Sequence, residues 1–342
     1  MIYRSKAPLR IGFAGGGTDV SPYSDLYGGA VLNAAISLYA NTHIEKIDEN
    51  KIIFKSIDQQ KTLIIDKDQT IDHDNELKLL TGVYHSIVQD FGTIEGGLKI
   101  TTHVDVPAGS GLGTSSTLVV SLIGAFAEMM KLPLGEYDIA QYAYKIEREK
   151  LNLAGGRQDQ YAATFGGINF MEFYKNDHVI VNPLRIRREY IQELETNLVL
   201  FFTSTSRASA DIIKKQQENV KTNKSSSIDA MHKLKEQSRL MKEAILKGNL
   251  DEIGEVLDFG FKEKKKMADN ITNPLIEEIY SIAVKAGATG GKISGAGGGG
   301  FMIFYCPGTT RYNVIEKLSE QGGKVVDYSF NKYGLTSWTS KK

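Results

Sequence analysis

The sequence of 342 residues has a single cysteine, Cys306, and carries as many basic as acidic side chains, 41 of each. One thiol excludes an intrachain disulfide and a metal site built from several cysteines, which is typical of a protein that stays in a reducing compartment. The lack of a basic excess removes the electrostatic basis for binding nucleic acid or an anionic membrane. We therefore expect a cytoplasmic protein with no nucleic-acid and no membrane partner.

The sequence also lacks a long hydrophobic run. The longest apolar stretch, residues 118–130, is interrupted by Ser, Gly and Glu, and it falls short of the ~20 residues that a membrane-spanning helix needs. Residues 1–9 carry two basic side chains but no apolar segment of the kind found in a secretory signal. The length and the 41% of hydrophobic residues predict a folded protein of two domains.

Glycine, in contrast, is abundant: 34 residues, about 10% against a typical ~7%. The strongest of three glycine clusters is PAGSGLGTSS, residues 107–116, between a predicted strand and a predicted helix from Thr114. A glycine-rich loop that leads into a helix presents free N–H groups and the positive end of the helix dipole, and so favours a phosphate chain. The hydroxyls of residues 114–116 are suited to a phosphate-bound Mg²⁺. The alternative is a turn with a Ser or Thr N-cap.

The other two clusters are FAGGGTD, residues 13–19, and KISGAGGGG, residues 292–300. Adjacent glycines allow a ligand to approach the backbone closely. In the first cluster Asp19 supplies a carboxylate that can accept sugar hydroxyls, and Arg10 precedes it on the predicted strand. The alternatives are a flexible loop with an Asp cap for the first cluster and a glycine-rich hairpin for the second.

Two carboxylates, Glu147 and Asp159, lie twelve positions apart on either side of a Gly-Gly pair. One is suited to coordinate a metal while the other faces a hydroxyl that is to be activated. The alternative is that Glu147 lies on the surface of a helix.

The order of predicted elements favours two α+β domains, residues 1–185 and 186–342, separated by a polar connector at 182–195. In the first half, we predict strands at 2–13, 30–47, 51–65, 97–103, 167–173 and 178–181, and helices at 76–89, 114–130 and 136–150. In the second half, we predict a strand at 198–202, helices through most of 208–282, strands at 288–293 and 301–306, and a final helix and strand.

The motifs APLRIGFAGGGTD, PAGSGLGTSS and KISGAGGGG, in this order, resemble those of the GHMP kinases, the family of galactokinase, homoserine kinase, mevalonate kinase and phosphomevalonate kinase. The resemblance covers essentially the whole chain. It implies a two-domain α+β fold with an N-terminal domain like ribosomal protein S5 domain 2, a ferredoxin-like C-terminal domain, and an active site between them. It also implies ATP and Mg²⁺ as cofactors.

The family's functional residues can be carried over by position. The resemblance implies that Asp159 is the catalytic carboxylate with Arg10 beside it, and that Glu147 binds the metal together with Ser115 or Ser116. The residues implied for ATP are Pro107, Gly109, Ser110, Gly111, Leu112, Gly113, Thr114, Ser115 and Ser116. Those implied for the sugar are Gly15, Gly16, Gly17, Thr18, Asp19, Gly295, Ala296, Gly297 and Gly298.

Within the family, GGGTDVSPY and YGGAVLNAAI are similar to the bacterial kinases of D-glycero-D-manno-heptose 7-phosphate, and next to L-fucokinase-like enzymes. GGGTD stands where galactokinases carry Gly-Glu-His-Thr-Asp-Tyr, so the Glu and His that contact galactose are absent. The resemblance implies an ATP-dependent sugar 1-kinase whose partners are small molecules, with a homodimer as a candidate assembly. A non-catalytic sugar sensor and a nucleotide-binding scaffold on the same fold stay open as alternatives.

A sugar that already carries a phosphate requires a second anion site. Residues 203–210 follow a predicted strand, offer several hydroxyls and Arg207, and open a helix, which is typical of a phosphate site. The alternative is an ordinary capped helix start with an exposed Arg. We interpret the basic tracts 185–188 and 262–266 as solvated faces, with dimer or substrate contact as the alternative.

Overall fold

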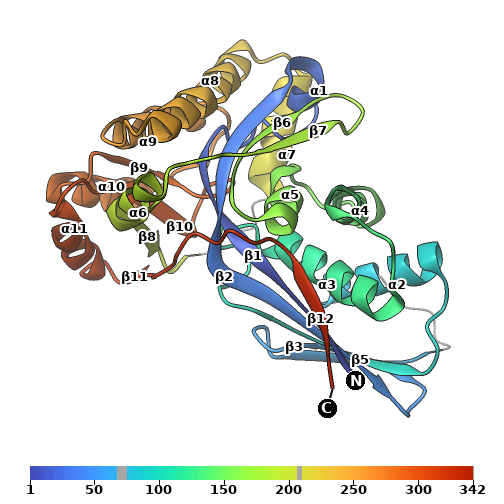
Figure 1. Cartoon of the computed structure of the whole chain (residues 1–342). Helices are drawn as coiled ribbons and strands as arrows, with labels where there is room; N and C mark the ends of the chain where they lie inside the picture. The colour runs from blue at the N-terminus through green and yellow to red at the C-terminus, as the bar shows by residue number, and fades with distance from the viewer. Residues whose placement is uncertain (68–74, 206–209, 342) are drawn as a thin grey trace.

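The computed structural model describes residues 1–67, 75–205 and 210–341 (Figure 1). It contains an eight-stranded and a four-stranded sheet, both flanked by helices, so the predicted α+β class is confirmed. The larger sheet is formed by β1 (Ile2–Ala14), β2 (Gly29–Ile47), β3 (Lys51–Ser56), β4 (Lys61–Asp66), β5 (Gly97–Val104), β6 (Ile168–Phe173), β7 (Val179–Pro183) and β12 (Thr336–Ser340). The smaller sheet is formed by β8 (Leu198–Phe202), β9 (Gly290–Ile293), β10 (Phe301–Tyr305) and β11 (Lys324–Val325).

The larger sheet is organised around its two long strands, in the order β12-β1-β2-β5-β3-β4, with β6 on β2 and β7 on β6. Residues 29–34 of β2 pair with β6, and residues 40–47 pair with β5. This long strand therefore links two parts of the sheet. Among the described pairs, only β3 and β5 run parallel.

Helices from the first half cover this sheet. The helix α3 is apolar nearly all round and buried against β1 and β2, as expected for a helix with no solvated face. Its first residue, Thr114, directly follows the glycine-rich loop at 107–113, so the packing of this helix fixes the loop's position. The first-half helices are α1 (Tyr23–Tyr27), α2 (Lys78–Phe91), α3 (Thr114–Met130), α4 (Glu136–Lys145), the π-helix η1 (Ile146–Lys150) and α5 (Gln158–Phe165).

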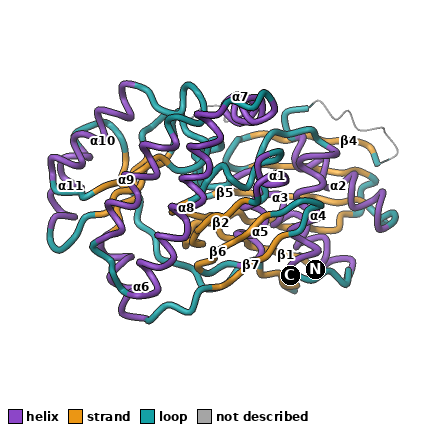
Figure 2. Tube along the Cα trace, turned by 90° about the horizontal axis from the view of Figure 1, so that it is seen from above, coloured by secondary structure: helices purple, strands orange, loops and turns teal. Residues whose placement is uncertain are grey.

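The smaller sheet lies beside the larger one and is covered by helices of the second half (Figures 1 and 2). Its helix α8 also contacts β1 and β2, which joins the two halves. The chain then returns to the larger sheet, where β12 pairs with β1 and places the two termini side by side. The division at residues 185 and 186 stays a prediction. The second-half helices are α6 (Arg188–Asn197), α7 (Ala210–Lys221), α8 (Ser225–Lys247), α9 (Glu252–Lys264), α10 (Pro274–Ala286) and α11 (Thr310–Ser319).

Three predicted elements differ from the structure. The strand predicted at 51–65 is a pair, β3 and β4, joined by a turn in which Gln60 adopts a φ of 54°. The helix predicted at 136–150 changes from α4 into the π-helix η1, and the predicted connector contains α6. None of the helices in the described part of the chain is long and apolar enough to cross a membrane.

Candidate active site

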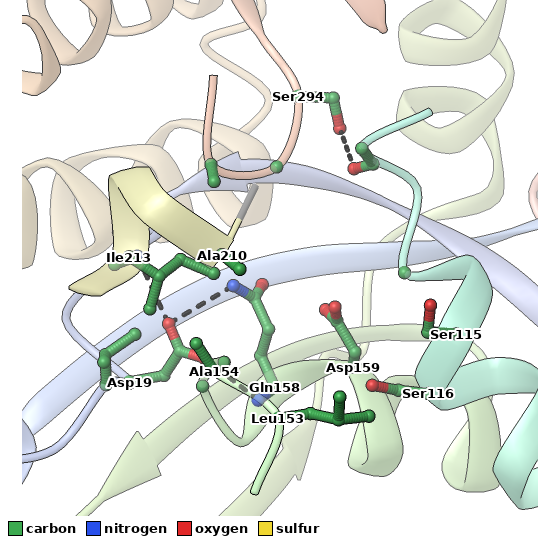
Figure 3. A pocket seen from close by; sticks show the side chains of 18 of the residues that line it. Asp19, Ser115, Ser116, Leu153, Ala154, Gln158, Asp159, Ala210, Ile213 and Ser294 are labelled. Atoms are coloured by element: carbon green, nitrogen blue, oxygen red, sulfur yellow. Dashed lines mark hydrogen bonds between the residues drawn. The ribbon is translucent and has the colours of Figure 1, made fainter. Parts of the chain in front are cut away.

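A pocket of about 240 Å³ lies between the two halves of the molecule (Figure 3). Its walls come from the loop before α3, the start of α5, the loop between β9 and β10, the first turns of α7 and the end of α9. The structure brings residues of all three predicted glycine clusters and both predicted carboxylates to this one pocket.

The loop before α3 reaches the helix through glycines in the left-handed region. Gly111 and Gly113 have φ angles of 85° and 78°, which only glycine adopts readily. Gly113 is the N-cap residue of α3 and offers no side chain to its first N–H groups. The Ser or Thr N-cap proposed as the alternative is therefore wrong, and the start of α3 lines the pocket without a side-chain cap, an arrangement that favours an anion.

This loop packs directly on the glycine loop of the second half. A Cβ on Gly111 would lie 2.6 Å from the carbonyl oxygen of Ser294, and a Cβ on Gly295 would lie 2.7 Å from Gly111 Cα. The Ser294 hydroxyl donates to Gly111 O at 2.9 Å, and Phe301 N donates to Ser110 O at 2.9 Å. The second-half loop connects β9 to β10 as a hairpin, which was the alternative expected for this glycine cluster. It also forms part of the pocket wall.

Not every residue predicted for ATP lines the pocket. Ser110 and Leu112 are fully buried, and Pro107 is exposed but does not line the pocket. Gly298 of the second-half loop does not line the pocket, although Gly299 does. The predicted nucleotide and loop residues that do line it are Gly109, Gly111, Gly113, Thr114, Ser115, Ser116, Gly295, Ala296 and Gly297.

Arg10 and Asp159 form a partly buried ion pair that lines the pocket. Arg10 lies on β1, is 4% exposed, and donates from Nε and NH2 to Asp159 Oδ1 at 2.8 and 2.7 Å. Its NH1 donates to the carbonyl of Gly111 at 2.5 Å, which ties the pair to the loop before α3. Because both contacts from Arg10 reach Oδ1, the second oxygen of this carboxylate, on a side chain that is 23% exposed, is left for a ligand.

Glu147 lies on the π-helix η1 and is 1% exposed, so the alternative of a surface glutamate is wrong. Ser116 donates its hydroxyl to one carboxylate oxygen at 3.0 Å, and Gln160 donates to the other at 2.5 Å. Burial raises the pKa of Glu147, while the neighbouring Arg148 and the two hydrogen bonds oppose that rise. A π-helical turn is frequently found at functional sites.

The oxygen atoms of Glu147 and Ser116 fit a Mg²⁺ ion. Mg²⁺ prefers oxygen ligands and is usually held by one or two carboxylates together with substrate phosphates. Within the described ranges, no cluster of three or more His, Cys, Asp or Glu side chains is placed to hold a metal on its own. The pair next to the anion-binding loop therefore suits a metal that arrives with a phosphate chain.

Asp19 was predicted to accept sugar hydroxyls, and the structure gives its carboxylate four N–H donors. Gly17 N and Gln158 Nε2 donate to Oδ1 at 3.2 and 3.3 Å, and the backbone N–H groups of Arg157 and Gln158 donate to Oδ2 at 3.0 and 3.1 Å. Asp19 is 2% exposed and caps the start of α5, the helix that carries Asp159. The contact with a sugar stays a prediction.

The remaining residues of the first glycine cluster shape the loop. A Cβ on Gly15 would lie 1.9 Å from the carbonyl oxygen of Ala30 on β2. The Thr18 hydroxyl bonds to Gly15 O at 2.8 Å and to the backbone of Ala30. Of the residues predicted here for the sugar, Gly17 and Asp19 line the pocket, while Gly15, Gly16 and Thr18 do not.

Sequence reasoning missed several pocket residues, and Lys264 is the most informative. The tract 262–266 was interpreted as solvated, which holds for the lysines at 262, 265 and 266, each paired with a carboxylate. Lys264 instead follows Leu257 and Phe261 on the buried stripe of α9, a helical spacing that is visible in the sequence.

Arg207, the predicted second anion site, lies outside the described residues. Other missed pocket residues are Arg148, Gln158, Gln216 and Ser294.

Two family models match the chain. Residues 78–167 match the GHMP kinases N terminal domain, and residues 241–324 match the GHMP kinases C terminal domain. The curated D-glycero-alpha-D-manno-heptose 7-phosphate kinase of Campylobacter jejuni is 46% identical over 335 residues, which covers 98% of both chains.

Solved structures of other proteins are also similar to this chain. A D-glycero-D-manno-heptose 1-phosphate kinase from Bacteroides thetaiotaomicron superposes with a TM-score of 0.85 at 42% identity, and covers 99% of this chain and 100% of that one. The galactokinase of Lactococcus lactis, at 18% identity and a TM-score of 0.75 over 98% and 95% of the two chains, shares the fold. The predicted two-domain fold is thereby confirmed.

Proposed function

Because the chain belongs to the GHMP kinase family, we propose that it transfers the γ-phosphoryl group of ATP to the anomeric hydroxyl of D-glycero-D-manno-heptose 7-phosphate. The observation that carries this proposal is the position of Asp159 in the pocket, between the anion-binding loop and the loop of Asp19 (Figure 3). The 46% identity to a heptose 7-phosphate kinase supports the choice of sugar.

In this proposal, the N-terminus of α3 and the loop before it hold the phosphates of ATP. The loop glycines Gly109, Gly111 and Gly113 line the pocket without a side chain, and the free N–H groups of the helix favour negative charge. Glu147, with Ser116 or its neighbour Ser115, would hold Mg²⁺, which neutralises charge on the phosphate oxygens.

Asp159 then acts on the acceptor. Phosphoryl transfer depends on alignment and charge neutralisation more than on covalent chemistry, so the carboxylate has to orient the C1 hydroxyl and take its proton. Arg10 holds one carboxylate oxygen and leaves the other oxygen for the hydroxyl. A sensor or a scaffold without catalysis would need neither this pair nor the metal-suited pair of Glu147 and Ser116.

The test is a kinase assay with heptose 7-phosphate, fucose, galactose and mannose as acceptors, with the position of the new phosphate read by ³¹P NMR. We expect turnover with the heptose 7-phosphate and a product phosphorylated at C1. A higher kcat/KM with fucose would replace the proposal by an L-fucokinase-like activity. Nucleotide binding without turnover on any of the four sugars would favour a binding protein.

A further inference from the structure

Lys264 is a buried cation that the proposed phosphoryl transfer does not use. It is the last residue of α9, is 2% exposed, and lines the pocket. Within residues 1–67, 75–205 and 210–341, its ammonium group makes no hydrogen bond and has no carboxylate within 4.0 Å. Withdrawing an ammonium from water without a partner is costly, so such a group indicates a missing anion.

The charges around Lys264 do not supply that anion. Asp19 attracts the ammonium, but four N–H donors already occupy its carboxylate. Arg10 repels it, and so does Lys292, which is also buried and donates to Gly12 O at 2.7 Å. Burial, with a contribution from Arg10, lowers the pKa of Lys264 to about 8, and an anion beside it would reverse that shift.

A second buried donor without an acceptor, the side-chain amide of Gln216, lies next to the loop that carries Asp19. Gln216, on α7, is buried and lines the pocket, and its Nε2 has no hydrogen-bond partner among the residues described. A Cβ on Gly16 would lie 3.7 Å from Lys264 Nζ, and a Cβ on Gly17 would lie 3.6 Å from Gln216 Oε1. Lys264 Nζ and the side-chain amide of Gln216 therefore lie beside successive glycines of this loop, and Met267 also packs against Gly17.

We propose that Lys264 and Gln216 form the site that binds the phosphate already carried by the acceptor sugar. This inference rests on the proposed function, which requires a second anion site apart from the ATP loop. A phosphomonoester brings negative charge and three acceptor oxygens, which a lysine and an amide N–H can bind together. The sequence suggested Arg207 for this phosphate, and that residue lies outside the described residues.

The position of the site separates it from the ATP phosphates. In Figure 3, Ser115 and Ser116 lie on one side of Asp159, while Asp19 and the α7 residues Ala210 and Ile213 lie on the other. Lys264 and Gln216 belong to the Asp19 side, because they flank the loop that carries Asp19. A sugar with its C1 hydroxyl at Asp159 would thus point its far end toward them.

The experiment compares Lys264→Met with Lys262→Met, since Lys262 is exposed and pairs with Asp258. We expect Lys264→Met to raise the KM for heptose 7-phosphate by ~10–100-fold, the range for a lost charge-assisted hydrogen bond, with less than threefold change in the KM for ATP. Gln216→Leu should raise the same KM by ~3–10-fold. Lys262→Met should match the wild type, and thermal unfolding would verify that each variant is folded.

An unchanged KM for heptose 7-phosphate in folded Lys264→Met would overturn the inference and leave the proposed function standing. A rise in the KM for ATP alone would also overturn it, by placing Lys264 at the nucleotide.

Calorimetric binding of heptose 7-phosphate and of the unphosphorylated heptose gives a readout independent of turnover: only the phosphorylated sugar should lose affinity in Lys264→Met. The wild type could bind the sugar phosphate without turning it over, while Lys264→Met loses that binding. This outcome would support the phosphate site and refute the kinase activity. Should Lys264→Met fail to fold, an unchanged KM in Gln216→Leu would overturn the inference.

Discussion

The two ends of the pocket are built in different ways. The end that we propose for the nucleotide, hereafter the nucleotide end, has a wall of backbone, because loops from both halves pack glycine against glycine around Gly111 and Gly295. The end that we propose for the acceptor, hereafter the acceptor end, has the side chains of Asp19, Gln216 and Lys264, drawn from three segments far apart in the sequence. A site made of backbone leaves a glycine signature in the sequence, whereas a site made of scattered side chains leaves almost none.

This difference also bears on how specificity can change. At the nucleotide end an added Cβ would meet backbone atoms, so the loop can accept few substitutions. At the acceptor end single side chains can be exchanged without moving the backbone. A galactokinase at 18% identity shares this fold, and one fold can carry different functions.

The largest effect should come from the residue at the boundary between the two ends. Asp159→Asn removes the carboxylate with little change in size, so we expect kcat to fall by ~10²–10⁴-fold while ATP and sugar binding persist at both ends. Steady-state kinetics and calorimetric binding would measure this. Turnover within threefold of the wild type would rule out Asp159 as the general base.

The backbone character of the nucleotide end can be tested with Gly111→Val. The new side chain would meet Ser294 O and would be strained at a φ of 85°, so we expect ATP affinity to fall at least ~10²-fold. Gly308→Val is the matched control, because Gly308 also has a positive φ but has no atom within 4 Å of an added Cβ. If the folded Gly111 variant kept its ATP affinity, this loop would not be the phosphate site.

A smaller effect, confined to the nucleotide end, should follow Glu147→Gln. Removing the charge weakens a Mg²⁺ site, so we expect the Mg²⁺ concentration for half-maximal activity to rise ~10-fold while the KM for the sugar stays the same. Glu149→Gln, on an exposed position of the same π-helix, should leave the Mg²⁺ titration unchanged. Identical titrations for the two variants would assign the metal to other residues.

The smallest effect distinguishes two roles of Asp19 at the acceptor end. If its carboxylate caps α5, Asp19→Asn should lower the free energy of unfolding by about 1–2 kcal/mol and reduce kcat several-fold, because Asp159 loses its support. Asp229→Asn, at an exposed position of α8, provides the control. An unchanged stability combined with a raised KM for the sugar would instead favour the predicted hydroxyl contact.

Much of the fold could be predicted because its elements carry strong local signals. The buried helix α3 and the long strand β2 were placed to within a residue, since apolar periodicity and β-branched runs mark them clearly. The turn between β3 and β4 was missed because it contains neither glycine nor proline. The π-helical turn at Glu147 depends on tertiary contacts with Ser116 and Gln160, which no local pattern encodes.

The candidate site likewise contains residues that could be predicted from the sequence and residues that could not. The glycine loops and the carboxylates at 147 and 159 could be found from the sequence, because their spacing and composition are unusual. Lys264 could not be separated from its neighbours by composition, since four of the five residues at 262–266 are lysines. Its inward position follows from the helical spacing of Leu257, Phe261 and Lys264 on α9, a pattern that composition alone does not reveal.

The pairing of β12 with β1 constrains the order in which the chain can fold during synthesis. The strand β5 ends at residue 104 and β12 begins at residue 336. At ~5–20 residues per second, a ribosome needs roughly 10–50 s to cover that interval. Throughout it, one edge of β1 lacks its final neighbour and exposes backbone N–H and C=O groups that another nascent chain can pair with. The residues of β12 are therefore the ones that protect this edge of β1 from aggregation.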